Sequence, residues 1–243
     1  MSRQAQGSGS LPDAAGLSIV AVIPAHNEAA RIGEVVRSAA AYLPVIVVDD
    51  GSTDDTASRA RDAGATVVEQ RPNQGKGSAL RAGFRRALAD GAAAVVTLDG
   101  DGQHDPSEIP TFVAAYRAAG EARPDLIIGR RDFRTMPASR RLANELGRRA
   151  FSWAVGRDIP DNQSGFRLIG SDLAEATLAS DEAGFEFEVE VITVCIRRGG
   201  RISWVPVRTI YAGQGSHIRP LQHLAHFVRI VAKARRAIAA HRG

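Results

Sequence analysis

The 243-residue chain has little cysteine and no possibility of an internal disulfide. Its one cysteine, Cys195, lies in the apolar stretch VITVCI. Proteins that depend on disulfides fold in oxidising compartments, whereas cytoplasmic proteins keep their thiols reduced. An apolar setting is typical of a core thiol rather than of a nucleophile. We therefore expect a cytoplasmic protein without cysteine chemistry.

Long apolar runs are also missing. No stretch approaches the ~20 residues that a helix needs to span a bilayer. Residues 1–16, MSRQAQGSGSLPDAAG, lack the apolar segment of a signal peptide and have the Gly/Ser-rich composition of a mobile tail. Any membrane contact is therefore predicted to be peripheral, on the cytoplasmic face.

Several binding motifs are absent as well. His26, His104 and His217 do not have the spacing of zinc ligands, and no Gly-x-Gly-x-x-Gly follows the first predicted strand. Aromatic residues make up only 5% of the chain and are not interleaved with basic residues, while the formal net charge is +4. These features argue against a zinc site, a Rossmann dinucleotide site and nucleic-acid binding.

Short β-rich runs alternate with helical segments in the first half of the chain. This order is typical of parallel βαβ units, so we expect an α/β fold with a mostly parallel central sheet and helices on both faces. The expected strands are 17–24, 45–49, 66–69, 94–98 and 126–128, and the expected helices are 28–42, 54–64 (with Asp54 or Asp55 as N-cap), 76–89 and 106–119 (with Asp105 as N-cap).

The second half is less regular. We expect helices at 138–155 and 186–198, a strand at 201–211, loops at 158–166 and 212–220, and a helix from Leu221 almost to the end. The predicted organisation is a tail at 1–16, one domain at 17–220, and a C-terminal basic amphipathic helix at 221–243.

The stretch VVTLDGDGQHDP (95–106) carries the clearest chemical signal. Asp99, Asp101 and Gln103 follow a short apolar strand at alternate positions, so extended chain directs them to one side. Their oxygens suit a hard divalent cation such as Mg²⁺ or Mn²⁺ at the carboxyl end of the strand. The alternative is an Asp/Gly turn that only reverses the chain.

Three other segments precede helices. Pro24–Glu28 (PAHNE) can offer free helix amides to a polar ligand or serve only as an N-cap, and Asp49 and Asp50 can bind a base or ribose or act as turn residues. In NQGKG (73–77), Lys76 is followed by Gly77, which differs from the P-loop pattern, although Lys76 can still meet a phosphate as a point charge.

In combination and order, these motifs resemble family 2 glycosyltransferases of the GT-A fold. The resemblance is carried by VIPAHNE (22–28), VVDDGSTDDT (47–56), NQGKGSALRAGF (73–84), TLDGDGQHDP (97–106), IIGRR (127–131), DNQSGFR (161–167), FEFEVE (185–190) and VPVRTIY (205–211). The last four are similar to the branch that transfers a hexose, with inversion, from GDP-mannose or UDP-glucose to a polyprenyl (undecaprenyl or dolichyl) phosphate.

The resemblance implies roles for individual residues. Pro24, Ala25, Glu28 and Asp50 would hold the base and ribose, and Asp99 and Asp101, with Gln103, would hold the metal on the donor diphosphate. Arg131, Arg141 and Arg167 would bind acceptor phosphate and diphosphate oxygens, and Glu190 would lie near the acceptor. Asp101, Arg131 and Glu190 are the expected catalytic residues, and Lys76 is expected to contact donor phosphate.

The predicted C-terminal helix carries two open interpretations. Leu221, Leu224, Val228, Val231 and Ile238 form an apolar stripe, and residues 219–243 contain six Lys or Arg and no acid. Such a helix can lie on an anionic membrane or pack on its own domain with a solvated basic face.

Three other functions stay open at this stage. One is a family 2 enzyme with a soluble or glycan acceptor. The second is a sugar nucleotidyltransferase, although PAHNE lacks the Gly-rich loop that such enzymes carry after the first strand. The third is a non-catalytic nucleotide-sugar-binding module, against which the intact Asp99 and Asp101 argue.

Overall fold

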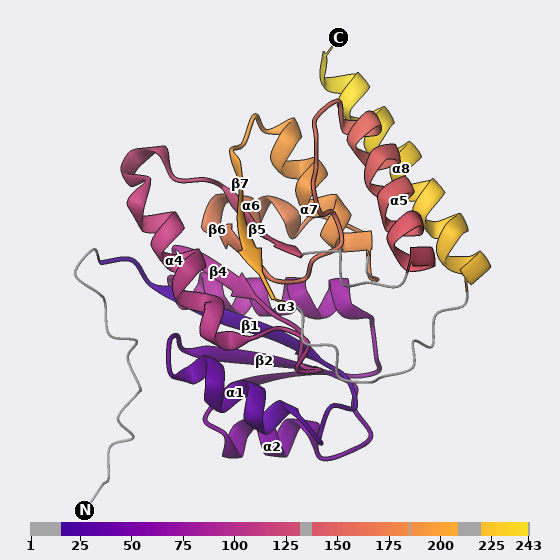
Figure 1. Ribbon diagram of the computed structural model, residues 1–243. Helices are drawn as coiled ribbons and strands as arrows, with labels where there is room; N and C mark the ends of the chain where they lie inside the picture. Colours follow the sequence, from indigo (N-terminus) through magenta and orange to yellow (C-terminus); the bar gives the residue numbers. More distant parts are fainter. Residues whose placement is uncertain (1–15, 132–137, 185, 209–219, 243) are drawn as a thin grey trace, which may run out of the picture.

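A seven-stranded sheet forms the centre of the molecule (Figure 1). A computed structural model describes residues 16–131, 138–184, 186–208 and 220–242, with side chains outside 138–143, 220–227 and 241–242. The strand order is β3-β2-β1-β4-β6-β5-β7, and only β6 runs antiparallel to its neighbours. The strands are β1 (Ile19–Ala25), β2 (Val45–Asp50), β3 (Thr66–Gln70), β4 (Ala94–Thr97), β5 (Leu126–Arg131), β6 (Arg167–Gly170) and β7 (Ile202–Val207).

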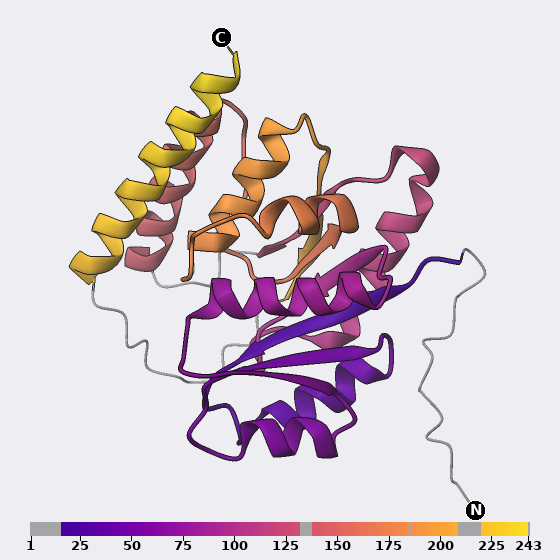
Figure 2. The ribbon, with the colours of Figure 1, turned by 180° about the vertical axis from the view of Figure 1, so that it is seen from behind.

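Helices cover both faces of this sheet, which confirms the expected α/β architecture. Alternation along β1 creates two cores: Val22 packs in the core that contains Phe84, and Ile23 packs in the core that contains Val36. The first core also contains residues of α3 (Lys76–Ala89), α5 (Ala138–Val155), α6 (Ser171–Thr177), α7 (Glu186–Arg197) and α8 (Pro220–Arg242), and the second contains residues of α1 (Ile32–Ala40), α2 (Thr56–Asp62) and α4 (Ile109–Ala118). Figure 2 shows α3 lying across the strands on the face opposite α1 and α2.

The first helix begins at Ile32 rather than at Glu28 as the pattern predicted. Asn27 adopts a left-handed backbone (φ 56), which interrupts a helix. Its amide donates to Ser52 Oγ at 2.9 Å, and the amide of Glu28 donates to Thr56 Oγ1 at 2.8 Å. Ser52 and Thr56 thus bind the amides of Asn27 and Glu28 in the turn that precedes the helix.

Two elements between 167 and 177 were missed from sequence. Arg167–Gly170 forms the antiparallel strand β6 between β4 and β5, and Ser171–Thr177 forms α6. Four residues give too short a pattern to identify a strand by alternation. The helices predicted at 76–89 and 138–155 are confirmed, while the segment 106–119 divides into a 3₁₀ turn, η1 (Pro106–Glu108), and α4, with Asp105 capping the turn by accepting from the Ser107 amide.

The C-terminal helix packs on its own domain, beside α5 and α7 (Figures 1 and 2). Ile230, Ala234 and Ile238 are buried, whereas Val228 of the predicted apolar stripe is 59% exposed. Leu221 and Leu224 belong to the part of α8 whose side chains are not described, and the predicted tail, the end of the strand predicted at 201–211 and most of the loop at 212–220 lie outside the described residues. Among the described residues, no helix is both long and apolar enough to cross a membrane.

Candidate active site

The candidate site lies at the carboxyl ends of β1, β2 and β4. The chain passes from β1 to β2 on one side, while β4 lies on the other side of β1. Ligands of open α/β sheets bind in the crevice at such a switch point. Pro24 and Ala25 end β1 against Gly100, since a Cβ on Gly100 would lie 3.3 Å from the Pro24 carbonyl oxygen and 3.4 Å from Ala25 Cβ. The predicted donor residues at the end of β1 therefore adjoin the predicted metal motif.

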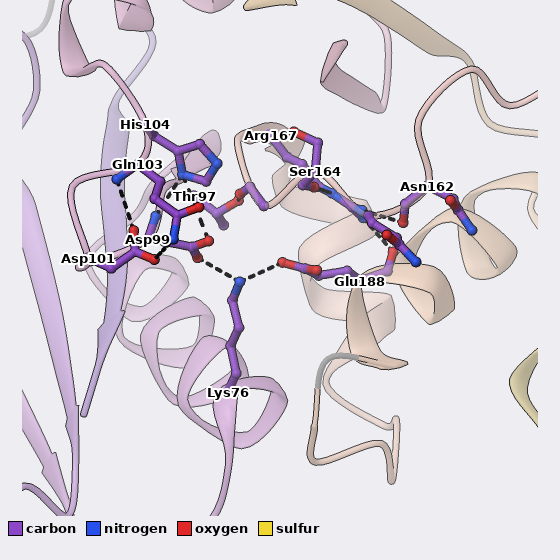
Figure 3. A network of polar contacts seen from close by, with 12 residues as sticks. Lys76, Thr97, Asp99, Asp101, Gln103, His104, Asn162, Ser164, Arg167 and Glu188 are labelled. Atoms are coloured by element: carbon purple, nitrogen blue, oxygen red, sulfur yellow. Dashed lines mark hydrogen bonds and ion pairs between the residues drawn. The ribbon is translucent and has the colours of Figure 1, made fainter. Parts of the chain in front are cut away.

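A partly buried lysine joins two acids at the centre of the site (Figure 3). Lys76 Nζ lies 2.6 Å from Asp99 Oδ1 and 2.8 Å from Glu188 Oε1. Burial lowers the pKa of Lys76, but the charges of Asp99 and Glu188 outweigh it, so that the pKa is raised above its usual value. Burial likewise raises the pKa of Asp99, and the charge of Lys76 overcomes it and holds the pKa below its usual range. Lys76 and Asp99 therefore form a charged pair at neutral pH.

Asp101 and Gln103 form a second pair beside Asp99. The Gln103 side-chain amide donates to Asp101 Oδ2 at 2.6 Å, and the Gln103 backbone amide donates to Asp101 Oδ1 at 2.9 Å (Figure 3). Negative charge accumulates here: burial first, and then the charge of Asp101, raise the pKa of Glu28. The structure thus joins Asp101 to Gln103, while it directs the carboxylate of Asp99 to Lys76.

The region around Glu28, Asp101 and Gln103 suits a divalent cation that takes its remaining ligands from water and substrate. No group of three or more His, Cys, Asp or Glu side chains is arranged to hold a metal among the residues with described placement. Mg²⁺ commonly uses one or two carboxylates and completes its shell with water and substrate phosphate. Glu28 and Asp101 lie close enough for the charge of Asp101 to raise the pKa of Glu28, after burial, while Arg31 lies 3.9 Å from Glu28. The oxygen donors present are those that such a cation would use.

His104 holds the backbone of the predicted metal motif in place. The Asp99 backbone amide donates to His104 Nδ1 at 3.0 Å, and the His104 ring lies 5.3 Å from the Phe166 ring, centroid to centroid. Burial lowers the pKa of His104, with the charge of Asp99 acting in the opposite direction. The neutral ring thus serves as an acceptor that fixes the backbone at Asp99.

Asp50 is held by the backbone of a neighbouring loop. Its Oδ1 accepts from the Gln74 amide at 2.8 Å, and its Oδ2 accepts from the Gly75 amide at 2.7 Å. Asp50 is also almost fully buried. The carboxylate thus ties the end of β2 to the loop before α3, which places Lys76.

Arg131 and Asp161 form the polar pair of the second half. Arg131 Nε donates to Asp161 Oδ2 at 2.8 Å and Nη2 donates to Asp161 Oδ1 at 2.9 Å, while Asp161 is 2% exposed. This bidentate pairing orients the guanidinium at the end of β5. Arg141 lies on α5, in the part whose side chains are not described.

Arg167 and Glu190 do not lie as the resemblance implies for direct ligand contact. Arg167 is buried, and its guanidinium donates to the carbonyl oxygens of Ser164, Asn162 and Glu188 (Figure 3). Glu190 Oε2 instead lies 3.1 Å from Lys233 Nζ of α8. Arg167 is thus engaged by backbone carbonyl oxygens, and Glu190 is engaged by Lys233.

Glu188 is a site residue that sequence reasoning missed. Successive residues of a helix are rotated by about 100°, so Glu188 and Glu190 on α7 point in roughly opposite directions. The repeated acids of FEFEVE signal an acidic helix start, but only the packing of α7 decides that Glu188 faces Lys76.

Gly165 allows Asp99, which follows β4, and Glu188 of α7 to lie close together. A Cβ at this position would lie 3.0 Å from Asp99 Oδ2 and 3.0 Å from Glu188 Oε1. The Thr97 hydroxyl also donates to the Gly165 carbonyl at 2.8 Å, which joins β4 to this loop. A larger side chain at 165 would therefore separate the acids that share Lys76.

Comparison with known proteins gives the family. The sequence model of glycosyl transferase family 2 matches residues 20–174, well over half of the chain. The chain therefore belongs to this family and is a glycosyltransferase, which sets the sugar nucleotidyltransferase reading aside.

Individual relatives are similar over most of their length. An undecaprenyl-phosphate mannosyltransferase of Micrococcus luteus is 30% identical over 209 residues, covering 79% of this chain and 83% of the relative. Glycosyltransferase AglJ of Haloferax volcanii is 33% identical over 221 residues, covering 87% of this chain and 68% of the relative.

A solved structure confirms the expected GT-A fold. The glucosyl-3-phosphoglycerate synthase of Mycobacterium tuberculosis, in complex with Mn²⁺, UDP and glucosyl-3-phosphoglycerate, aligns with a TM-score of 0.68 at 26% identity. The match covers 90% of this chain and 79% of that chain. A structural neighbour of this protein thus binds a divalent metal together with a nucleoside diphosphate.

Proposed function

We propose that this protein is an inverting hexosyltransferase that moves mannose or glucose from a nucleotide diphosphate sugar, GDP-mannose or UDP-glucose, to a polyprenyl phosphate. The observation that carries the proposal is the two-part site: Asp99 and Asp101 follow β4, while Arg131 is oriented at the end of β5. The name of the Micrococcus luteus relative supports the lipid phosphate as acceptor.

The donor side would be formed by the first half of the chain. Asp101 and Gln103, together with Asp99 when it is not held by Lys76, would bind Mg²⁺ or Mn²⁺ through oxygen. When bound, the cation would neutralise charge on the departing diphosphate. Lys76 would add a positive charge toward the donor phosphates, and the base and ribose would lie along Pro24, Ala25, Glu28 and Asp50.

The acceptor side would use Arg131. Its guanidinium fork suits phosphate oxygens, and Asp161 holds it in place. A phosphate acceptor is ionised at neutral pH, so positioning and charge stabilisation would supply most of the rate without a strong base. Arg141 would join Arg131, while Arg167 would act by fixing the carbonyls around residues 162–164.

Peripheral membrane contact would bring the enzyme to its lipid acceptor. Three apolar side chains on α5 and α8 are exposed: Leu146, Trp153 and Val228. The Arg235 guanidinium lies 4.8 Å from the centre of the Trp153 ring. Tryptophan side chains are enriched at the interface between membrane and water.

A transfer assay tests the proposal directly. The protein is incubated with Mn²⁺, radiolabelled GDP-mannose or UDP-glucose, and polyprenyl phosphate, and the product is extracted into organic solvent. We expect label in the organic phase with one of the two donors, and its loss with EDTA. Organic-phase label that is unaffected by EDTA would contradict the metal assignment.

A soluble acceptor is the second candidate, because a structural neighbour is a glucosyl-3-phosphoglycerate synthase. The same assay with phosphoglyceric acid separates the two. Label that stays in the aqueous phase as a new phosphorylated glycoside, with none in the lipid, would replace the lipid acceptor by the soluble one.

Liposome sedimentation tests the membrane contact. We expect full-length protein to sediment with anionic liposomes at low salt and less so at high salt. The double variant Arg235→Gln/Arg236→Gln should weaken sedimentation; truncation of α8 is unsuitable because it removes Ile230, Ala234 and Ile238 from the core. Absence of sedimentation at low salt would assign α8 to the domain alone.

A further inference from the structure

Two cations of the C-terminal helix are bound within the protein. Arg229 Nη2 donates to Glu182 Oε2 at 2.9 Å, and Lys233 Nζ donates to Glu182 Oε1 at 2.9 Å. Lys233 also reaches Glu190 of α7 at 3.1 Å. The Glu182 side chain is only 8% exposed, so it depends on these partners for the compensation of its charge. Two of the basic residues of α8 thus form ion pairs within the protein.

Glu182 belongs to a turn that covers the beginning of α3. The Ala183 carbonyl oxygen accepts from the Gly77 amide at 2.6 Å and from the Ser78 amide at 3.3 Å. The Arg81 guanidinium donates to the Glu182 carbonyl. The first amides of a helix have no partner within the helix, so this turn satisfies them.

The close fit explains the glycine after Lys76. A Cβ on Gly77 would lie 2.5 Å from the Glu182 carbonyl oxygen and 2.7 Å from Phe187 Cβ. The second glycine of NQGKG therefore permits contact between two parts of the chain. The amides of Gly77 and Ser78 face the protein's own carbonyl rather than an open phosphate cradle.

The same turn is connected to the candidate site through Lys76. Lys76 is the first residue of α3 and directly precedes Gly77, whose amide donates to the Ala183 carbonyl. Its side chain pairs with Asp99 and Glu188. Glu188 lies on α7, which Lys233 contacts through Glu190. Lys233 therefore contacts both segments that hold Lys76 in place, the turn at Glu182 and the helix α7.

We infer that Glu182, clasped by Arg229 and Lys233, is a positioning residue that places Lys76 for the donor phosphates, so that the C-terminal helix is part of the catalytic apparatus. The clasp consists of Glu182, Arg229 and Lys233. The inference rests on the proposed function only for the role of Lys76 toward donor phosphate; the link from α8 to α3 rests on the contacts themselves.

Hydrogen exchange in the full-length protein tests the link without any substrate. The clasp variants are Glu182→Gln and Lys233→Met, and Arg236→Gln is the matched control, because Arg236 is an exposed α8 cation whose Nε faces the carbonyl of Ala232 in its own helix. We expect exchange of the Gly77 and Ser78 amides to accelerate about tenfold in both clasp variants, with unchanged exchange in the later turns of α3 and in the control.

Unchanged exchange at Gly77 and Ser78 in a folded clasp variant overturns the inference. Uniform acceleration along α3 also overturns it, because that result reports general destabilisation. If Glu182→Gln does not fold, Lys233→Met alone decides, and Lys233→Arg should restore the wild-type exchange because the guanidinium keeps the charge.

Kinetics separate positioning from mere stability. We expect the donor KM to rise about tenfold in Lys233→Met, with a smaller change in the acceptor KM and with recovery in Lys233→Arg. Equal donor KM values in wild type and Lys233→Met would show that the clasp does not act on the donor site. If the wild type transfers no hexose, the proposed function fails, whereas the exchange result still decides the clasp.

Discussion

The half of the chain up to β4 and the half from β5 onward build their parts of the site in different ways. In the first half, Asp50, Asp99 and Asp101 lie at or within a few residues of strand ends that a parallel sheet brings to one edge. In the second half, Arg131 depends on Asp161, which is 30 residues away. Strand ends thus bring the carboxylates of the proposed donor side to one edge, although Lys76 there is also held by Glu188 of α7. Arg131 of the proposed acceptor side depends on a contact with a distant segment.

The two halves also differ in how charge is balanced. On the side of Glu28 and Asp101, burial first and then the charge of Asp101 raise the pKa of Glu28, while Arg31 lowers it. On the other side, Arg131 is matched by Asp161, and Arg229 and Lys233 of α8 are matched by Glu182. Substitutions on the donor side should therefore change ligand binding, and substitutions on the acceptor side should change both stability and function.

Of the substitutions that test this difference, Asp101→Ala is expected to have the largest effect on transfer activity. Removal of one carboxylate from the candidate metal site should lower transfer by about a thousandfold or more, since each ~1.4 kcal/mol of lost stabilisation is tenfold in rate. The fold should be retained, as judged by circular dichroism. The control is Asp105→Ala, which removes only the cap of η1. Activity of Asp101→Ala close to that of the control would contradict the metal assignment.

Lys76→Met tests the contact between the halves. It leaves Asp99 and Glu188 facing each other without a cation, which should cost about 3 kcal/mol of the free energy of unfolding. Urea unfolding measures this loss. Arg85→Met, an exposed change on the same helix, is the control. A stability change as small as that of the control would mean that the ion pairs do not join the halves.

Arg131→Ala should separate acceptor use from donor binding. Turnover with lipid phosphate should fall about a hundredfold, in line with the loss of a charge-assisted phosphate contact, while nucleotide affinity by calorimetry stays near wild type. Arg130→Ala is the neighbouring control, because Arg130 is exposed on the same strand. A large loss of nucleotide affinity with normal acceptor kinetics would place Arg131 on the donor side.

The smallest expected effect is a pH dependence of stability that arises at His104. Burial lowers the folded-state pKa of His104, so the unfolded chain binds this proton more readily. Stability is therefore lost as the pH falls below the unfolded histidine pKa of about 6.5, and is unaffected by this group well above it. His104→Asn, whose side-chain oxygen can replace the Nδ1 acceptor, should show a smaller loss between pH 7 and 5 in urea unfolding. Parallel pH curves for the two proteins would exclude His104 as the source.

Much of the donor side could be predicted from sequence because its determinants are local. The apolar run before Asp99 makes a strand, as predicted. Asp101 and Gln103 meet in a turn at Gly102 (φ 76), where the Gln103 amide donates to Asp101 Oδ1, and not through the predicted extended alternation. The helix that begins at Lys76 was predicted correctly, although the distant Ala183 carbonyl accepts from its first amides. The cap at Asp105 depends on neighbouring residues and was also predicted correctly. The family's motifs lie in the same segments, and the family itself is confirmed.

Only the tertiary structure decided which charges meet. The spacing of residues in the sequence cannot show that Glu188 rather than Glu190 faces Lys76. Both acids lie on one helix, and the packing of that helix decides which of them points to Lys76. Likewise, the basic composition of α8 could not show that Arg229 and Lys233 are taken up by Glu182. The sequence by itself determined most of the elements, the motifs and the family through short-range patterns, but not β6 or α6. The ion pairs depend on long-range packing, which fixes where each side chain points and which charge it meets.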